Sequence, residues 1–381
     1  MKIIGFTVAL LAIAGSVAAD PLSAELEDVS AEAEKLVIEH EVPGLVMAVI
    51  VGGELRATGA AGIRNRADKE PQKVEIDDKF HIGSLTKSFT AVLASTFVEE
   101  GKLTWDAKVS ETLRISGMNK GFESLTFEQL LCHQGGLREQ LNGALKRQAW
   151  LQANPKRTRL TLTQALLRDA PEFPPGSTYH YSNAGYTVAG AMMESLTAES
   201  WEQLVVKKIF VPLDMKSAGF LAPAVDPLDN SKTLDEPWGH NAVGRPMAPH
   251  PYGGGPVGTS PAMSIHCSIL DLAKYAKFHM QKVPGPILKK KETFEDLHRP
   301  RKNQYALGWA TVRPRWTGGK LALNHHGTNT MFTAQIWIVP DLNFSAMVAT
   351  NIGGDAGREA CEGAISALVR RYRFELLRGS R

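Results

Sequence analysis

A serine and a lysine lie three residues apart in Ser84-Leu85-Thr86-Lys87, the only S-x-x-K sequence in the chain. On a helix, residues three apart project from the same face, so the hydroxyl and the amine would be neighbours. The N-terminus of a helix carries partial positive charge, and a lysine with a lowered pKa can take the serine proton. The spacing therefore predicts a nucleophile, Ser84, that is activated by Lys87. A surface Ser-Lys pair at a helix start is the alternative.

Tyr181-Ser182-Asn183 is the only Y-x-N sequence, and it stands between the turn signal Pro174-Pro175-Gly176 and an apolar helical stretch. A tyrosine on such a loop can act as a general base if neighbouring cations lower its pKa. The asparagine amide can both donate to and accept from a substrate amide. We therefore expect Tyr181 to handle a proton and Asn183 to bind substrate. A core tyrosine followed by a turn asparagine is the alternative.

His325-His326-Gly327 ends a predicted strand. Neighbouring strand residues point to opposite faces, so only one histidine can face a site. Gly327 leaves room for substrate along the strand edge, and the N–H groups of Thr328 and Ser84 would form an oxyanion hole. We expect no metal and no other cofactor, because the two histidines lack a nearby third ligand and no H-E-x-x-H sequence occurs.

Hydrophobic periodicity assigns these motifs to recognisable elements. Gly83-Ser84 opens a helix that runs to about Glu100, where Gly101 follows as a C-cap. Leu45 to Val51 and Glu54 to Ala61 form a predicted β-hairpin around two glycines. Four later strands are predicted at Tyr305 to Val312, Lys320 to Asn324, Thr333 to Val339 and Phe344 to Asn351. Other helices are predicted at Leu22 to His40, Thr126 to Cys132, Thr161 to Asp169, Ala184 to Leu196, Ser268 to Met280 and Ala356 to Leu377.

The early and late strands must join in one sheet, since neither group could otherwise bury its apolar face. We therefore predict an α+β fold: an antiparallel sheet flanked by helices, a mostly helical second region, and an active site in the cleft between them. Residues 1–19 are assigned to a signal peptide and 20–381 to a single catalytic domain. Within that domain, 20–101 and 305–381 form the sheet region and 102–304 the helical region.

The composition fits a globular chain of 381 residues with 22% charged residues and a net charge of +3. Such a chain can bury a sizeable core without disulfides or metals. Acidic and basic residues are mixed along the chain, which argues against a nucleic-acid partner. Cys132, Cys267 and Cys361 are odd in number and widely spaced, so we expect each to be a small buried residue.

The N-terminus has the pattern of a secretory signal. Lys2 is followed by an apolar run from Ile3 to Val17 and then by Ala18-Ala19. This pattern predicts a periplasmic or secreted protein with no stable membrane span after cleavage. An uncleaved anchor is the alternative, although the run is short for a span of about 20 residues.

The three motifs resemble those of the serine β-lactamase-like superfamily. They are most similar to its class C β-lactamase branch, which includes D-alanyl-D-alanine carboxypeptidases, esterases and D-aminopeptidases. In that branch S-x-x-K, Y-x-N and K-T-G or H-x-G follow in this order at similar spacings. The resemblance covers roughly residues 40 to 355. Further matching segments are Val42-Pro43-Gly44, Phe80 to Lys87, Glu100 to Leu103, Leu130 to Leu137, Pro212 to Met215 and Gly308-Trp309.

This resemblance implies that Ser84 is acylated, that Lys87 and Tyr181 activate it and pass its proton to the leaving group, and that Asn183 holds the acyl amide. His325 stands where other members carry lysine, and would tune Tyr181 or meet a substrate carboxylate. If the charge of His325 matters, the rate should titrate near an ordinary histidine pKa. The implied function is a serine hydrolase that takes a small-molecule or peptide substrate: a β-lactam, a D-alanyl peptide or a small ester.

Two departures from the family pattern bear on the substrate. His326 occupies a position that is usually small or hydroxylated, and Pro261-Ala262-Met263-Ser264 replaces the family's P-A-G-G. We expect the bulk of His326 and Met263 to narrow the cleft. Both features weaken the case for a β-lactamase more than the case for a hydrolase.

Two other functions have some support in the sequence. Gly258-Thr259-Ser260-Pro261-Ala262 approaches the G-x-S-x-G elbow of α/β-hydrolases, but it ends in alanine and lies in a Pro/Gly loop. A penicillin-binding or cell-wall-peptide-binding protein on the same fold, with little or no turnover, would carry the same three motifs.

Overall fold

The computed structural model describes residues 26–138, 143, 154–226, 232–250, 255–281 and 285–378, with side chains up to residue 373. The predicted signal peptide, residues 1–19, lies outside the described residues. All the residues proposed for the active site lie within them.

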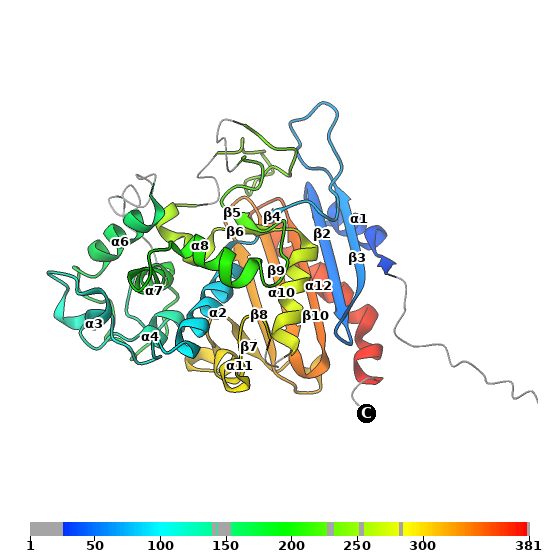
Figure 1. The fold of residues 1–381 in the computed structure, drawn as a ribbon. Coiled ribbons are helices and arrows are strands. Elements are labelled where there is room, and N and C mark those ends of the chain that lie inside the picture. Colours follow the sequence, from blue (N-terminus) through cyan, green and yellow to red (C-terminus); the bar gives the residue numbers. More distant parts are fainter. Residues whose placement is uncertain are drawn as a thin grey trace, which may run out of the picture.

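A seven-stranded sheet runs through the right half of the molecule in Figure 1. In spatial order its strands are β1 (Glu27–Asp28), β3 (Glu54–Gly62), β2 (Gly44–Val51), β10 (Phe344–Thr350), β9 (Thr333–Val339), β8 (Ala322–Thr328) and β7 (Ala310–Val312). Only the pairing of β1 with β3 is parallel. N-terminal β2 pairs directly with C-terminal β10, so the two ends of the chain complete one sheet, as the sequence predicts.

Strand β2 explains why the sheet has helices on both faces. Val46, Ala48 and Ile50 enter one hydrophobic core, whereas the alternate residues of the same strand enter the other. A strand buried on both faces reads as a continuous apolar run, which is the pattern seen here. Helices α1 (Ser30–Glu39) and α12 (Gly354–Arg378) cover one face, and α2 (Thr86–Glu99) and α10 (Ile269–Gln281) contribute to the core on the other (Figure 1).

The helical part occupies the left half of Figure 1. Its main helices are α3 (Val109–Leu113), α4 (Phe127–Leu131), α6 (Pro155–Leu166), α7 (Asn183–Ser195) and α8 (Trp201–Val205). Two further short helices, α9 (Ser260–Met263) and α11 (Lys291–His298), lead back towards the sheet. Helix α7 is buried along most of its length and packs against α4, α6 and α2, so it anchors this part to the rest of the molecule.

A second, three-stranded sheet lies between these two parts, in the order β4 (Phe80–His81), β6 (Ile265–Cys267) and β5 (Gly219–Phe220). It pairs Phe80 with Cys267 and His81 with His266. The chain leaves β4 and enters a short 3₁₀ turn, η1 (Gly83–Leu85), which continues into α2. This small sheet therefore fixes the point at which Ser84 enters the structure.

The predicted fold class is confirmed: the molecule has a mixed sheet flanked by helices and a helical second part. Several boundaries differ from those expected. Strand β8 extends to Thr328, so the third motif lies inside it, and β7 is limited to three residues. Helix α6 begins at Pro155, where Asn154 caps it, rather than at Thr161. Helix α10 packs on the large sheet, although it lies within the stretch assigned to the helical region. All three cysteines are buried and unpaired.

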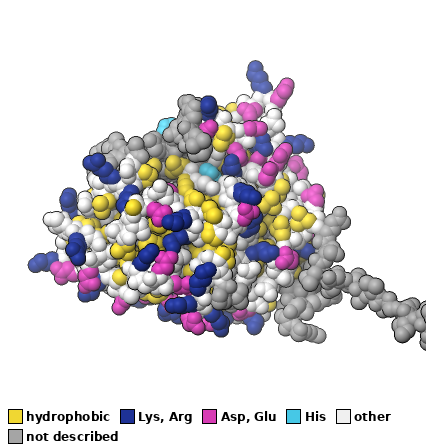
Figure 2. All heavy atoms as spheres, in the orientation of Figure 1, with side chains coloured by type: hydrophobic (Ala, Val, Ile, Leu, Met, Phe, Trp, Pro, Cys, Tyr) yellow, Lys and Arg dark blue, Asp and Glu magenta, His cyan; other side chains and the backbone are white. Residues whose placement is uncertain are grey.

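The outer surface carries both signs of charge. On the face drawn in Figure 2, lysine and arginine side chains are interspersed with aspartate and glutamate. Within the residues that the structure describes, no helix is long and apolar enough to cross a membrane.

Candidate active site

Ser84 and Lys87 lie on successive turns at the entry to α2. Nζ of Lys87 donates a hydrogen bond to Oγ of Ser84 over 3.1 Å. Ser84 is partly exposed, whereas Lys87 is completely buried. The predicted pair is therefore formed, with the serine accessible and the amine beneath it.

The amine of Lys87 has two further partners, both from the helical side of the site. It lies 2.7 Å from Oδ1 of Asn183 and 3.0 Å from the carbonyl oxygen of Ala262. Neither partner is a carboxylate, and burial lowers the pKa of Lys87 well below its ordinary value. A buried amine with a lowered pKa can stay neutral and accept a proton.

Tyr181 and Asn183 reach the site from the loop that leads into α7. Nζ of Lys87 lies 4.7 Å from the centre of the Tyr181 ring. Asn183 is the first residue of α7, so the start of that helix sets the position of its amide. The structure therefore brings the first and second motifs together around a single amine.

His133, in the matching segment Leu130 to Leu137, holds this loop in place, a function that the three motifs do not predict. Its Nδ1 accepts the N–H of Ser182, and its carbonyl oxygen accepts the N–H of His180 over 2.8 Å. Its ring packs 4.2 Å from the ring of Tyr181. His133 is fully buried with a φ of 59°, and burial together with the charge of Lys87 lowers its pKa well below the ordinary value. It is therefore a neutral support beneath Tyr181.

Two glycines let strand β8 approach the turn that carries Ser84. A Cβ atom on Gly327 would lie 2.1 Å from the carbonyl oxygen of Ile82 and 2.7 Å from the amide nitrogen of Ser84. A Cβ atom on Gly83 would lie 2.4 Å from the amide nitrogen of Thr328. Only glycine fits at either position, and the backbone amides of Ser84 and Thr328 are thereby brought into the same small region. This proximity is compatible with the predicted oxyanion hole.

His325 also lies near Lys87, but its pKa differs from the ordinary histidine value that was expected. Burial and then the charge of Lys87 lower its pKa to about 3, so it does not titrate near an ordinary histidine value. Its described hydrogen bonds run from Nε2 to the hydroxyl of Tyr305, over 3.2 Å, and from Nδ1 to the carbonyl oxygen of His326. A pKa of about 3 argues against a rate that titrates near an ordinary histidine pKa, because no acidic group offsets the desolvation of His325. Sequence reasoning missed Tyr305 as a site residue.

The family model for beta-lactamases matches residues 28–369. The chain belongs to this beta-lactamase family. Among curated relatives, it is 24% identical to Protein flp of Staphylococcus aureus (strain MW2) over 365 residues. That match covers 89% of this chain but only 66% of the relative.

Solved structures show the same fold. A penicillin-binding protein homologue from Pyrococcus abyssi, described as octameric, matches with a TM-score of 0.72 and 26% identity, over 88% of this chain and 75% of its own. A class C beta-lactamase matches with a TM-score of 0.71 and 21% identity, over 88% of this chain and 93% of its own. The resemblance drawn from the three motifs is confirmed at the level of the family.

His326 and Met263, the two departures from the family's motifs that were expected to narrow the cleft, lie in different surroundings. His326 alternates with His325 along β8, and the charges that act on it come from Glu362 and Arg358 of α12. His326 therefore faces the helix behind the sheet and does not narrow the site. Met263 is partly buried against the core and approaches Gly255. Its neighbour Ala262 supplies the carbonyl oxygen that Lys87 contacts.

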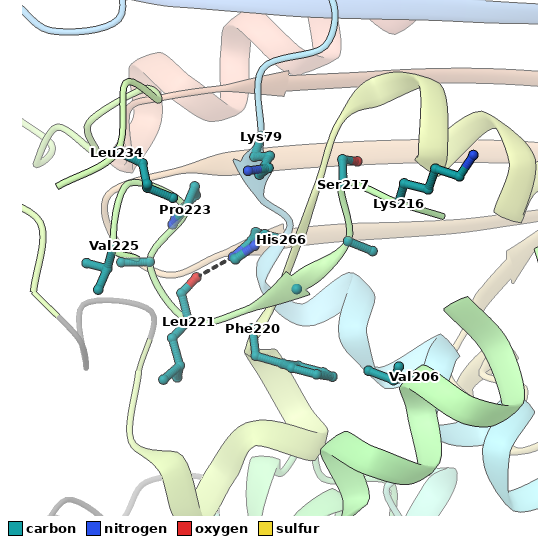
Figure 3. Close-up of a pocket in the computed structure, with 13 residues that line it drawn as sticks. Lys79, Val206, Lys216, Ser217, Phe220, Leu221, Pro223, Val225, Leu234 and His266 are labelled. Carbon is teal, nitrogen blue, oxygen red and sulfur yellow. Dashed lines mark hydrogen bonds between the residues drawn. The ribbon is translucent and has the colours of Figure 1, made fainter. Parts of the chain in front are cut away.

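A separate pocket of about 440 Å³ lies beside the small sheet (Figure 3). His266 lies at its centre and contacts the carbonyl oxygen of Leu221 over 3.0 Å. None of the residues proposed for catalysis or substrate binding lines this pocket. Among the described residues, no cluster of three histidine, cysteine or acidic side chains is placed to hold a metal ion.

Proposed function

We propose that this protein is a serine hydrolase that forms an acyl-enzyme on Ser84 and acts on amides or esters. The observation that carries the proposal is the buried amine of Lys87, which lies 3.1 Å from Oγ of a partly exposed serine and has a lowered pKa. A neutral amine at this distance is within reach of the serine proton.

Acylation proceeds in two steps. Neutral Lys87 accepts the proton of Ser84 as Oγ attacks the carbonyl carbon of the substrate. The oxygen of the tetrahedral intermediate takes up negative charge and is held by the N–H groups of Ser84 and Thr328. The C–N or C–O bond then breaks, and the proton passes from Lys87 by way of Tyr181 to the leaving group.

Deacylation repeats this chemistry with water as the nucleophile. Water adds to the acyl carbon, its proton passes to Lys87, and the bond to Oγ breaks as Ser84 recovers a proton. Asn183 serves both steps because its Oδ1 holds Lys87, which leaves its NH₂ group to donate to the acyl part of the substrate.

The substrate classes that we propose are β-lactams, D-alanyl peptides and small esters. The family supports them, and so does the fold shared with a class C beta-lactamase and a penicillin-binding protein homologue. A penicillin-binding or cell-wall-peptide-binding protein with little turnover is the second candidate. It is favoured by the same relatives and needs the same acylation by Ser84.

Intact-protein mass spectrometry after incubation with a fluorescent penicillin and, separately, p-nitrophenyl butyrate tests the proposal. We expect an adduct or turnover with at least one of the two probes on the wild-type protein, and neither with either probe on Ser84→Ala. A long-lived adduct would identify a receptor, whereas released product would identify a hydrolase. Turnover that is unchanged in Ser84→Ala would show that the assignment is wrong.

A further inference from the structure

Both ring nitrogens of His325 are engaged. Nδ1 lies 2.8 Å from the carbonyl oxygen of His326, which can only accept, so Nδ1 carries the hydrogen. Nε2 of the neutral ring is then an acceptor, and it lies 3.2 Å from the hydroxyl of Tyr305, which can donate either to it or to the hydroxyl of Tyr186. His325 therefore presents no further N–H group to a substrate.

Tyr305 is held firmly enough to maintain this state. It is buried, and the centre of its ring lies 4.7 Å from the ring centre of His133 and 5.8 Å from the ring centre of Tyr179. It meets the ring of His325 edge-on, at 77°. Burial raises the pKa of Tyr305 well above its ordinary value, so the hydroxyl keeps its hydrogen.

The charged and titratable groups around His325 oppose its protonation. The titratable groups that act on His325 are Lys87, His133 and His326, each of which is either neutral or positively charged. The fourth titratable neighbour is the hydroxyl of Tyr305. Burial is the larger cause of the pKa of about 3 at His325, and a proton on Lys87 lowers it further. A neutral imidazole whose outer nitrogen is an acceptor gives a carboxylate no counter-charge.

Other described cations next to the second motif are already paired. The guanidinium of Arg138 binds Asp169, and Lys302 donates to the carbonyl oxygens of Gly176 and Ser177. The amine of Lys87 contacts Oδ1 of Asn183 and the carbonyl oxygen of Ala262, so its two N–H groups are already engaged. A substrate carboxylate placed against His325 would lose its water without gaining an ion pair there, which is unfavourable.

We propose that Tyr305 determines substrate class: by occupying Nε2 of His325, it makes the site favour esters and amides whose leaving group is neutral over those whose leaving group carries a carboxylate. Tyr305 is a positioning residue, since it acts through His325. This inference rests on the proposed acylation of Ser84, and among the three proposed substrate classes it favours small esters, because β-lactams and D-alanyl peptides carry a carboxylate on the leaving group. The site would discriminate against the substrate with the anionic leaving group because that charge stays unpaired, and not because the neutral substrate gains a contact.

Two acetate esters of nearly the same shape test this proposal. In 3-carbamoylphenyl acetate the leaving group is neutral, and in 3-carboxyphenyl acetate it is an anion. The rate of Ser84 acylation is followed by intact mass, and kcat/KM by release of the phenol, at neutral pH. Each rate is divided by that ester's uncatalysed hydrolysis rate to remove the difference in leaving-group reactivity. We expect the wild-type protein to prefer the carbamoyl ester by about tenfold or more.

Three variants locate the cause of this preference. His325→Lys supplies an ammonium group and should reverse it. Tyr305→Phe keeps the ring but releases Nε2, and should reduce the preference by about threefold or more. Tyr179→Phe removes a hydroxyl from a neighbouring ring that has no described contact with His325, and should leave the preference unchanged.

The outcomes separate this inference from the proposed function. Equal acylation of Ser84 by both esters in the wild-type protein would overturn the inference and leave the hydrolase proposal intact. A preference that is unaffected by Tyr305→Phe but reversed by His325→Lys would show that Tyr305 has no part in it. If neither ester acylates Ser84, the proposed function fails and the inference fails with it.

Discussion

Nζ of Lys87 lies 2.7 Å from Oδ1 of Asn183, closer than the 3.1 Å that separates it from Oγ of Ser84. The amide oxygen of Asn183 therefore fixes the amine without adding charge. A carboxylate in the same place would stabilise the ammonium form and raise the pKa of Lys87. An uncharged hydrogen-bond partner leaves the pKa of Lys87 low, so the amine can accept a proton.

Asn183→Asp tests this relationship. We expect the acidic limb of the kcat/KM profile for p-nitrophenyl butyrate to move to higher pH, and the rate at neutral pH to fall about 10²-fold, because Lys87 becomes an ammonium that cannot take a proton. Asn241→Asp is the control, since Asn241 accepts two backbone N–H groups in a turn and a carboxylate would still accept them. An unchanged profile in Asn183→Asp would show that the charge state of Lys87 does not control the rate.

The burial of Lys87 also makes stability depend on pH. Its pKa is lowered in the folded protein, so between that value and the ordinary one the unfolded chain binds a proton that the folded chain does not. Stability must therefore rise with pH across this window. We expect the Tm of the wild-type protein to rise relative to that of Lys87→Met as the pH is raised towards the ordinary lysine pKa, about 10.4. Thermal unfolding of both proteins across this range checks it, and parallel Tm curves would contradict it.

Gly327→Ala tests the close approach of β8 to the turn at Ser84. The added methyl group would lie 2.1 Å from the carbonyl oxygen of Ile82 and 2.7 Å from the amide nitrogen of Ser84, both of which are backbone atoms. The strand must move, and loss of oxyanion alignment should lower kcat about 10²-fold to 10³-fold. Gly52→Asn, in a turn with open space at the added Cβ, is the control and should keep full activity. A fully active Gly327→Ala protein would show that the alignment of the two amides is unimportant.

The part of the site that the sequence predicts best is local. Ser84 and Lys87 are three residues apart at a helix start, and helix geometry alone makes them neighbours. The contact of Lys87 with Asn183 joins positions 96 residues apart, so it depends on how α2 and α7 pack. Only the resemblance to a family placed these two residues in one site.

The errors have physical causes. A strand was predicted over Lys320 to Asn324 with the third motif at its end, whereas the pairing of β8 with β9 continues through the motif to Thr328. The state of His325 depends on Tyr305, which approaches it only in the folded protein, and on desolvation, which no sequence pattern reports. The start of α6 could have been predicted from Asn154-Pro155, a capping residue followed by a proline at the first helical position.

His133 offers the sharpest test of how the Tyr181 loop is held. His133→Phe keeps a ring beneath Tyr181 but removes the acceptor of the Ser182 N–H, which should lower stability by about 1–3 kcal/mol. We expect kcat for p-nitrophenyl butyrate to fall about tenfold with it, because Tyr181 loses its fixed position.

His133→Asn is the matched variant. Its side-chain oxygen can still accept the Ser182 N–H, and asparagine tolerates the φ of 59° better than phenylalanine does. We therefore expect His133→Asn to lie between wild type and His133→Phe in both kcat and Tm. If His133→Asn is instead as impaired as His133→Phe, ring packing beneath Tyr181 and not the hydrogen bond to Ser182 positions the loop.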